Sequence, residues 1–185
     1  MFFSRFLPIL IVIGVTGPVL AIQFASGETA FNGAPKLLRA AVTDTSFEAY
    51  PVYYQFTVEL PAKLDEPLGQ LRIEIPNEYG VFGLRPPNPK DVRAFLPTEP
   101  NAQAPQYAAK FLATKVTVQG QTVALSFDPP VPPGNVVTVE WGPLRNPTQD
   151  GTYLYDVTAY PAGAMPRAQT VGYGRITIRQ NFGSH

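Results

Sequence analysis

The chain contains no cysteine, and its single histidine, His185, is the last of its 185 residues. Cysteine and histidine supply most nucleophiles, general bases and transition-metal ligands in proteins, so the common pocket-bound forms of these sites are excluded. The lack of cysteine also excludes a disulfide framework, so an exported form of the chain must be stabilised by its core alone. We therefore expect no cofactor and no metal site.

The chain also lacks an excess of charge of either sign. Lys and Arg together number 14, as do Asp and Glu, and the formal net charge is +0. A neutral chain without a run of Lys or Arg does not show the electrostatic signature of nucleic-acid or anionic-lipid binding. Hydrophobic residues make up 45% of the chain, which is typical of a folded domain.

The N-terminal segment, residues 1–21, has the layout of a signal peptide. Arg5 precedes an apolar run from Phe6 to Val15, Pro18 then interrupts the run, and small or acceptable residues lead up to Ala21. The run is shorter than the ~20 apolar residues of a spanning helix. We predict cleavage after Ala21 and an extracytoplasmic location in the periplasm, at the cell surface or outside the cell. An uncleaved membrane anchor is the alternative, because only one basic residue precedes the run.

The mature chain is expected to hold a polar arm, residues 22–34, and one domain, residues 35–182. The arm is predicted as a loose segment or an edge strand. In the domain, Val52, Tyr54 and Phe56 alternate with more polar residues, which indicates a strand with one buried face. The same alternation recurs at 38–42, 71–75, 116–118, 123–127, 137–141 and 176–178. Thr152–Ala159 is strand-like on both faces, which is typical of a central strand.

These segments make about eight strands, and their half-buried pattern predicts an all-β fold, an antiparallel Ig-like β-sandwich. The segment Asn88–Thr114 is predicted as a long crossover loop with one or two short helical turns. Asp128–Gly134 contains four prolines, so we interpret it as a rigid link rather than a central strand. Asn146–Gly151 is predicted as a tight loop.

Four motifs in the C-terminal third follow one another in a recognisable order. They are Asp128–Gly134, then Leu144–Pro147, then Gly151–Gly163 with the sequence GTYLYDVTAYPAG, then Gly172–Arg175. This series resembles the cyanobacterial domain-of-unknown-function family numbered 2808. The resemblance implies a small exported protein of cyanobacterial origin, and it implies no activity.

Catalytic and metal-binding patterns are weak in the rest of the chain. Asn146 and Asp150 could supply hard oxygen ligands to calcium, but no EF-hand spacing is present, and a turn whose side chains bond their own backbone is favoured. A copper site is rejected, because Met165 is the only methionine besides the initiator. Ser46 and Ser126 have no histidine base, and nothing in the spacing of the acids favours a glycosidase pair.

Aromatic residues make up 12% of the chain and are the more promising binding groups. Tyr153, Tyr155 and Trp141 are predicted to lie in the core. Tyr53 lies opposite the apolar face of its strand and Tyr160 lies in the C-terminal motif, so both could stack on a glycan or enter a protein interface. The predicted binding residues are therefore Tyr53, Asn146, Asp150 and Tyr160.

The sequence favours an exported, non-enzymatic binding or structural module that contacts protein or envelope glycan through loops and edge strands. One form of this hypothesis is self-association, in which the arm of one copy adds as a strand to a neighbour. The alternatives are a carbohydrate-binding or carbohydrate-active protein that uses carboxylates and exposed tyrosines, and a membrane-tethered accessory protein.

Overall fold

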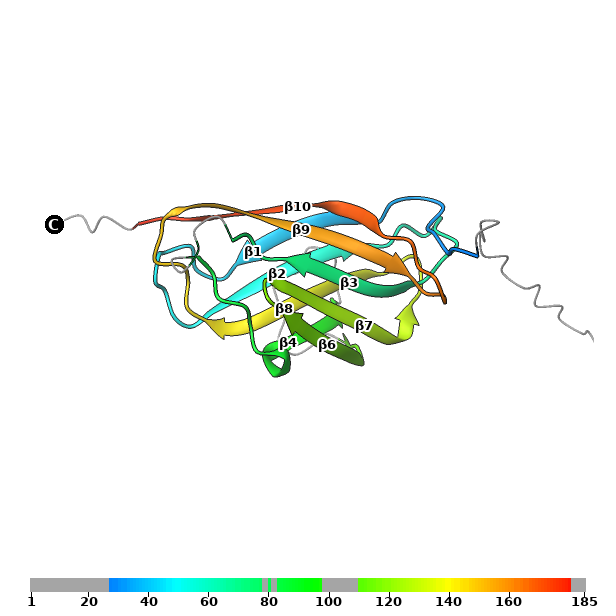
Figure 1. Ribbon diagram of the computed structural model, residues 1–185, viewed down its shortest axis with the longest axis horizontal. Helices are drawn as coiled ribbons and strands as arrows, with labels where there is room; N and C mark the ends of the chain where they lie inside the picture. The colour runs from blue at the N-terminus through cyan, green and yellow to red at the C-terminus, as the bar shows by residue number, and fades with distance from the viewer. Residues whose placement is uncertain (1–26, 78–79, 81–82, 98–109, 181–185) are drawn as a thin grey trace, which may run out of the picture.

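The computed structural model describes residues 27–77, 80, 83–97 and 110–180. It contains ten strands in two five-stranded sheets, which lie one behind the other in Figure 1. All pairings between neighbouring strands are antiparallel. The predicted all-β antiparallel sandwich is confirmed, with ten strands in place of about eight.

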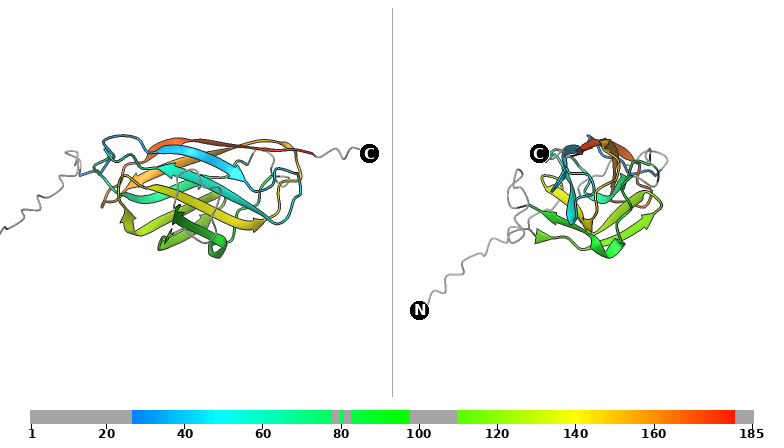
Figure 2. Two further views of the ribbon diagram at one scale, coloured as in Figure 1. Left: turned by 180° about the vertical axis from the view of Figure 1, so that it is seen from behind. Right: turned by 90° about the vertical axis from the view of Figure 1, so that its left-hand side faces the viewer.

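The first sheet has the strand order β1-β2-β8-β4-β5, and the second has the order β10-β9-β3-β7-β6. Figure 1 looks onto the outer face of the second sheet, and the left view of Figure 2 looks onto the first. In chain order the strands are β1 (Lys36–Val42), β2 (Val52–Glu59), β3 (Leu68–Glu74), β4 (Val92–Leu96), β5 (Lys110–Phe111), β6 (Thr114–Gln119), β7 (Thr122–Val131), β8 (Val136–Leu144), β9 (Gly151–Pro161) and β10 (Gln169–Ile178).

The core lies between the sheets and is built from the alternate residues that the sequence pattern identified. Phe56 on β2 packs with its ring centroid 4.8 Å from that of Trp141 on β8 and 5.1 Å from that of Tyr155 on β9. Tyr153, Tyr155 and Trp141 are each 0% exposed, which confirms their predicted place in the core. Burying such large rings contributes most of the favourable free energy of a core.

At one edge of the sandwich, β1 packs directly against β10. A Cβ atom on Gly174 would lie 2.6 Å from the Cβ of Ala40, so the absence of a side chain allows this close approach. The register of β1 against β2 shifts between Leu37 and Arg39. As a result, Leu37 packs against the core and Leu38 is exposed, although the simple alternation had grouped Leu38 with the inward residues.

The predicted crossover loop Asn88–Thr114 is only partly correct. A 3-10 turn does form at Pro89–Asp91, and the Asn88 side chain caps it by accepting a hydrogen bond from the Lys90 amide at 3.1 Å. The following residues, expected to be helical, form strand β4 instead. Val92 and Ala94 of this strand point into the core, whereas Phe95 is buried outside the core cluster. Residues 98–109 lie outside the described part of the chain.

The interpretation of Asp128–Gly134 as a link outside the strands is also wrong for its first half. Strand β7 continues to Val131, through Pro129 and Pro130. The reason is a register shift: Gln70 pairs with Ser126 and Leu68 pairs with Val131. The two prolines fall within this irregularity, where the missing amide hydrogens are not needed for the ladder.

The loops at one end of the sandwich are held together by Asn146. Its side chain is 2% exposed, and its amide nitrogen donates to the backbone oxygens of Asp44 (2.8 Å) and Ser46 (2.7 Å). Its carbonyl oxygen accepts a 2.6 Å hydrogen bond from the Tyr54 hydroxyl. This one amide therefore joins the β1–β2 loop, the β8–β9 loop and the core.

At the opposite end, the described part of the predicted arm is attached to its own domain. The amide of Thr29 donates to the Met165 oxygen at 3.0 Å, and the Thr29 oxygen accepts from the Arg167 amide at 2.8 Å. The Asn32 side chain donates to the Asp65 carboxylate at 2.7 Å. The segment thus adds as a short parallel bridge beside the β9–β10 loop.

No helix in the described ranges has the length and apolar character needed to cross a membrane. The predicted signal peptide, residues 1–21, lies outside those ranges.

We predict that Tyr54→Phe lowers the free energy of unfolding by about 1–3 kcal/mol at neutral pH, because the Asn146 carbonyl oxygen loses its buried partner. Burial, followed by the neighbouring Tyr153, raises the pKa of Tyr54 above the ordinary 10.0. The folded form therefore holds this proton more tightly than the unfolded form, and stability falls as the pH rises above 10. The free energy of unfolding, measured by chemical denaturation as the pH rises above 10, should fall less steeply with pH in the variant.

Tyr53→Phe is the matched control, because Tyr53 is half-buried on the outer face of the same strand. It should leave the free energy of unfolding at neutral pH unchanged. Equal effects of the two substitutions would show that the Tyr54–Asn146 contact does not hold the loops.

We predict that Gly163→Ala releases the N-terminal segment. The added Cβ would lie 2.4 Å from the Thr29 hydroxyl oxygen, a distance that no Cβ contact tolerates, so Thr29 must move away. Limited proteolysis should then cut within residues 27–34 faster than in the parent protein. Ala164→Ser adds one atom at the exposed neighbouring residue and should leave the cleavage rate unchanged; an unchanged rate for Gly163→Ala would refute the attachment.

Candidate functional site

The four predicted binding residues do not converge on one site. Tyr53 lies on the outer face of the first sheet, where its ring lies close to Gly142. Asp150 is exposed in the β8–β9 loop and accepts a 3.2 Å hydrogen bond from the Gln149 side chain. Asn146 lies in the same loop, but its side chain is buried and makes the three hydrogen bonds described above. Tyr160 lies on the outer face of the second sheet.

The outer face of the first sheet carries a buried polar network. The two carboxylate oxygens of Glu140 accept from Gln55 at 2.7 Å and from the Arg93 Nε at 2.8 Å. Thr57 and Thr138 share a 3.1 Å hydrogen bond across the same two strands. Glu140 is 5% exposed and already paired on both oxygens, so this network joins strands and does not present a reactive acid.

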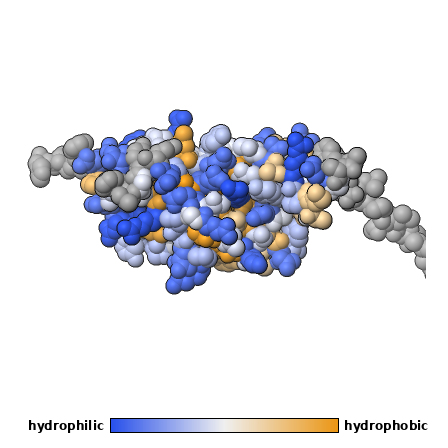
Figure 3. All heavy atoms as spheres, viewed as in Figure 1, coloured by the Kyte–Doolittle hydropathy of each residue, from blue (hydrophilic) through white to orange (hydrophobic). Residues whose placement is uncertain are grey.

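The outer face of the second sheet is the more open surface. Cross-strand pairing places Tyr173, Asp156, Glu74 and Thr122 in one row across β10, β9, β3 and β7. Leu154 lies on the same face of β9, two residues before Asp156. Figure 3, drawn from this side, shows a largely hydrophilic face with separate apolar areas.

Two large hydrophobic side chains project from this face into solvent. Tyr173 is 68% exposed and Leu154 is 43% exposed. They are diagonal neighbours, because Tyr173 pairs with Asp156 and Leu154 pairs with Arg175 on the same two strands. Their backbones are fixed by the β9–β10 ladder, so the surface is presented in one shape.

Charges of both signs surround these groups. Arg72 forms an ion pair with Glu74, and the pKa of Arg72 is raised by the Tyr160 hydroxyl and by Glu74. The Thr158 hydroxyl donates to Asp156 at 3.4 Å. Tyr160, a predicted binding residue, is thus placed beside a guanidinium on the same face as Leu154.

A hollow of about 380 Å³ lies at the end of this face. It is lined by Leu154 and Asp156 of β9, by Glu74 of β3 and its continuation to Asn77, and by Gln121 and Thr122 of the β6–β7 hairpin. A backbone hydrogen bond of 2.8 Å from Ile75 to the Gln121 oxygen holds the two sides together. We call this the Glu74–Asp156 hollow.

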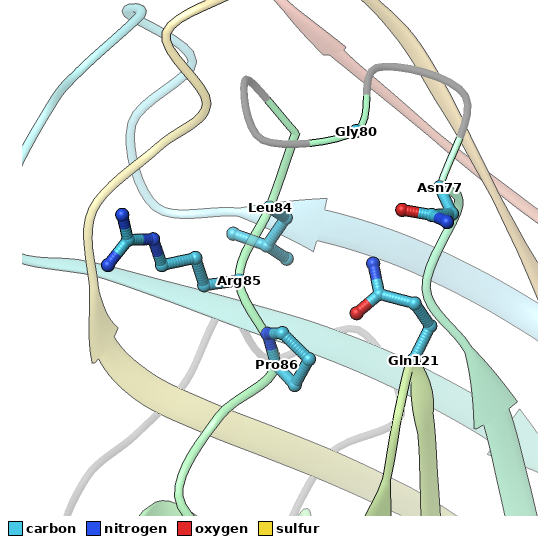
Figure 4. Close-up of a pocket in the computed structure, with 6 residues that line it drawn as sticks. All are labelled: Asn77, Gly80, Leu84, Arg85, Pro86 and Gln121. Carbon is cyan, nitrogen blue, oxygen red and sulfur yellow. The ribbon is translucent and has the colours of Figure 1, made fainter.

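A second hollow of about 400 Å³ adjoins the first and shares Asn77 and Gln121 with it. Figure 4 shows the side chains of Asn77 and Gln121 on one side of this space and those of Leu84 and Pro86 on the other, while Arg85 extends away. Leu84, which is 2% exposed, lines this second hollow with its apolar side chain.

Within the described ranges, no group of three or more His, Cys, Asp and Glu residues could hold a metal ion. The side chains on the outer face of the second sheet offer hydrogen bonding, ion pairing and apolar contact.

Sequence reasoning did not identify Leu154, Asp156, Glu74 or the amides of Asn77 and Gln121. For Leu154 and Asp156 a signal was present, because they have the opposite parity to Tyr153 and Tyr155 in one strand. For Glu74 the same signal was present, because it has the opposite parity to Ile73 in the alternating segment 71–75. For the amides of Asn77 and Gln121 no signal exists in a single sequence, because only strand pairing brings them beside β9.

Comparison with solved structures finds distant similarity. The bacterial hydrophobin BslA is 15% identical with a TM-score of 0.44, and the match covers 80% of this chain and 96% of that one. The collagen-binding subdomain of the Enterococcus faecalis surface protein ACE is 10% identical with a TM-score of 0.43, covering 80% and 99% of the two chains. The collagen adhesin of S. aureus is 7% identical with a TM-score of 0.42, covering 78% and 48%.

Comparison with curated proteins gives no match. A family model described as "Protein of unknown function (DUF2808)" matches residues 28–178, which span all ten strands. This is the family that the C-terminal motifs resemble. The chain belongs to the DUF2808 family of proteins of unknown function.

Proposed function

We propose that the chain is an exported, non-enzymatic binding module that contacts a protein or glycan of the cell envelope through the outer face of its second sheet. The observation that carries the proposal is the exposure of Tyr173 and Leu154, diagonal neighbours on the outer face of the paired strands β9 and β10. Large side chains held on strands lose little conformational freedom when a partner covers them, so they contribute strongly to binding.

Export is supported by the signal-peptide layout of residues 1–21. Cleavage after Ala21 would leave Ile22 as the first residue of the mature protein. A chain that keeps these residues in the membrane would correspond to the tethered alternative instead.

Two forms of the proposal differ in the partner. In the strand-addition form, the arm of one copy pairs with a neighbour, and Thr29 and Asn32 must first leave the contacts that they make within their own domain. In the glycan form, the outer face of the second sheet supplies both aromatic and polar groups. The carboxylates and amides that line the Glu74–Asp156 hollow favour the glycan form.

We predict that the double substitution Leu154→Ser and Tyr173→Ser weakens retention of the exported protein on its native envelope fraction by about tenfold or more, as expected when two central contact residues are lost. The measurement is co-sedimentation of purified protein with that fraction over a range of concentrations.

The matched control is Leu38→Ser with Tyr50→Ser, since these side chains are 47% and 61% exposed elsewhere on the molecule. The control should bind like the parent protein. Equal retention of both double variants would contradict a binding role for the second sheet, and equal loss would show that the effect is one of general surface hydrophobicity.

A further inference from the structure

The Glu74–Asp156 hollow contains polar groups that the protein does not use. Asn77 and Gln121 make no side-chain hydrogen bond with any described residue, although their backbone oxygens accept from Gly80 (3.2 Å) and Ile75 (2.8 Å). Each free amide offers two donor hydrogens and one acceptor oxygen. These bonds fix the backbone from which each amide projects, and neither amide is paired with another of the described residues.

The carboxylates of the hollow also keep unused acceptor capacity. Glu74 is paired with Arg72 through one oxygen, and Asp156 accepts from Thr158 through one oxygen. The remaining oxygen of each has no hydrogen bond within the described structure. The lining therefore combines free donors from the amides with free acceptors from the amides and the acids.

This combination selects among ligand classes. Two carboxylates directly opposite each other on neighbouring strands repel an anion such as phosphate. A basic peptide would meet the Arg72 guanidinium, which is already paired with Glu74. A ligand whose groups both donate and accept, and which carries no charge, satisfies the lining best; sugar hydroxyls have this property.

Apolar surface borders the polar groups. Leu154 and Pro76 line the hollow, and the exposed ring of Tyr173 stands beside Asp156 in the same cross-strand row. Sugar rings present C–H groups on one face, and such a face packs against aliphatic and aromatic side chains while the hydroxyls bond at the ring edge.

We propose that the Glu74–Asp156 hollow binds a neutral sugar unit of an envelope polysaccharide, with the amides of Asn77 and Gln121 bonding its hydroxyls and Leu154 packing against its C–H face. This inference rests on the proposed function and names the chemical class of the partner. The hollow opens on the sheet surface, so it accommodates a unit within a longer chain and not only a free sugar.

The test uses the exported protein labelled with nitrogen-15. Cellohexaose, maltohexaose, chitohexaose and the neutral polysaccharide fraction of the native envelope are titrated separately, with a polygalacturonate hexamer as the anionic comparison. At least one neutral probe should shift the side-chain amide signals of Asn77 and Gln121, and the affinity should be the same at low and high salt because no charge is neutralised.

Asn77→Ala with Gln121→Ala should weaken that binding by about tenfold or more. Gln119→Ala is the matched control, because Gln119 is exposed on β6 of the same sheet but does not line the hollow. Thermal denaturation of each variant establishes that the fold is retained, and the amide shifts of the parent protein provide a readout that requires no substitution.

The saccharide assignment is overturned if no neutral probe shifts these amides, or if only the anionic hexamer does. Loss of envelope retention in the Leu154 and Tyr173 double variant, together with unchanged retention in the Asn77 and Gln121 double variant, would preserve the proposed function and reject the saccharide. Unchanged retention in both double variants would reject the proposed function and the saccharide assignment together.

Discussion

The contact between the two inner sheet faces around Phe56 is the constraint on which the rest of the structure depends. With no disulfide to join them, the sheets are held by packed side chains such as Phe56 of the first sheet and Tyr155 of the second, whose ring centroids lie 5.1 Å apart. In each strand, alternate residues point into this contact. The residues between them point to an outer face, and on the second sheet that face includes Leu154, Asp156 and Tyr173.

The polar groups at the two ends of the sandwich hold its loops and its N-terminal segment in place. The Asn146 amide is fully used in connecting loops to the Tyr54 hydroxyl, and Thr29 and Asn32 are used in attaching the N-terminal segment. These polar groups are already satisfied, so a partner would have to break existing bonds to reach them. The uncommitted amides of Asn77 and Gln121 require no such exchange, which moves the proposed binding surface from loops to the sheet.

Much of the fold was predictable, because period-two alternation depends on local sequence alone. It identified eight strands and placed Tyr153, Tyr155 and Trp141 in the core. It failed at β4, where Phe95 is buried outside the core and hides the alternation, and at β7, where a register shift accommodates Pro129 and Pro130. The candidate site was largely unpredictable, because Glu74 and Asp156 are brought together only by a strand pairing between segments far apart in the sequence.

The most direct test of a passive sandwich that binds through its second sheet is photo-crosslinking in the native envelope. The photoreactive amino acid p-benzoylphenylalanine would be placed at position 154 in one protein and at position 38 in another, both exposed apolar positions, and the products analysed by mass spectrometry. The account predicts a discrete envelope adduct from position 154 and none from position 38. Adducts from position 38 alone, or from neither position, would contradict it.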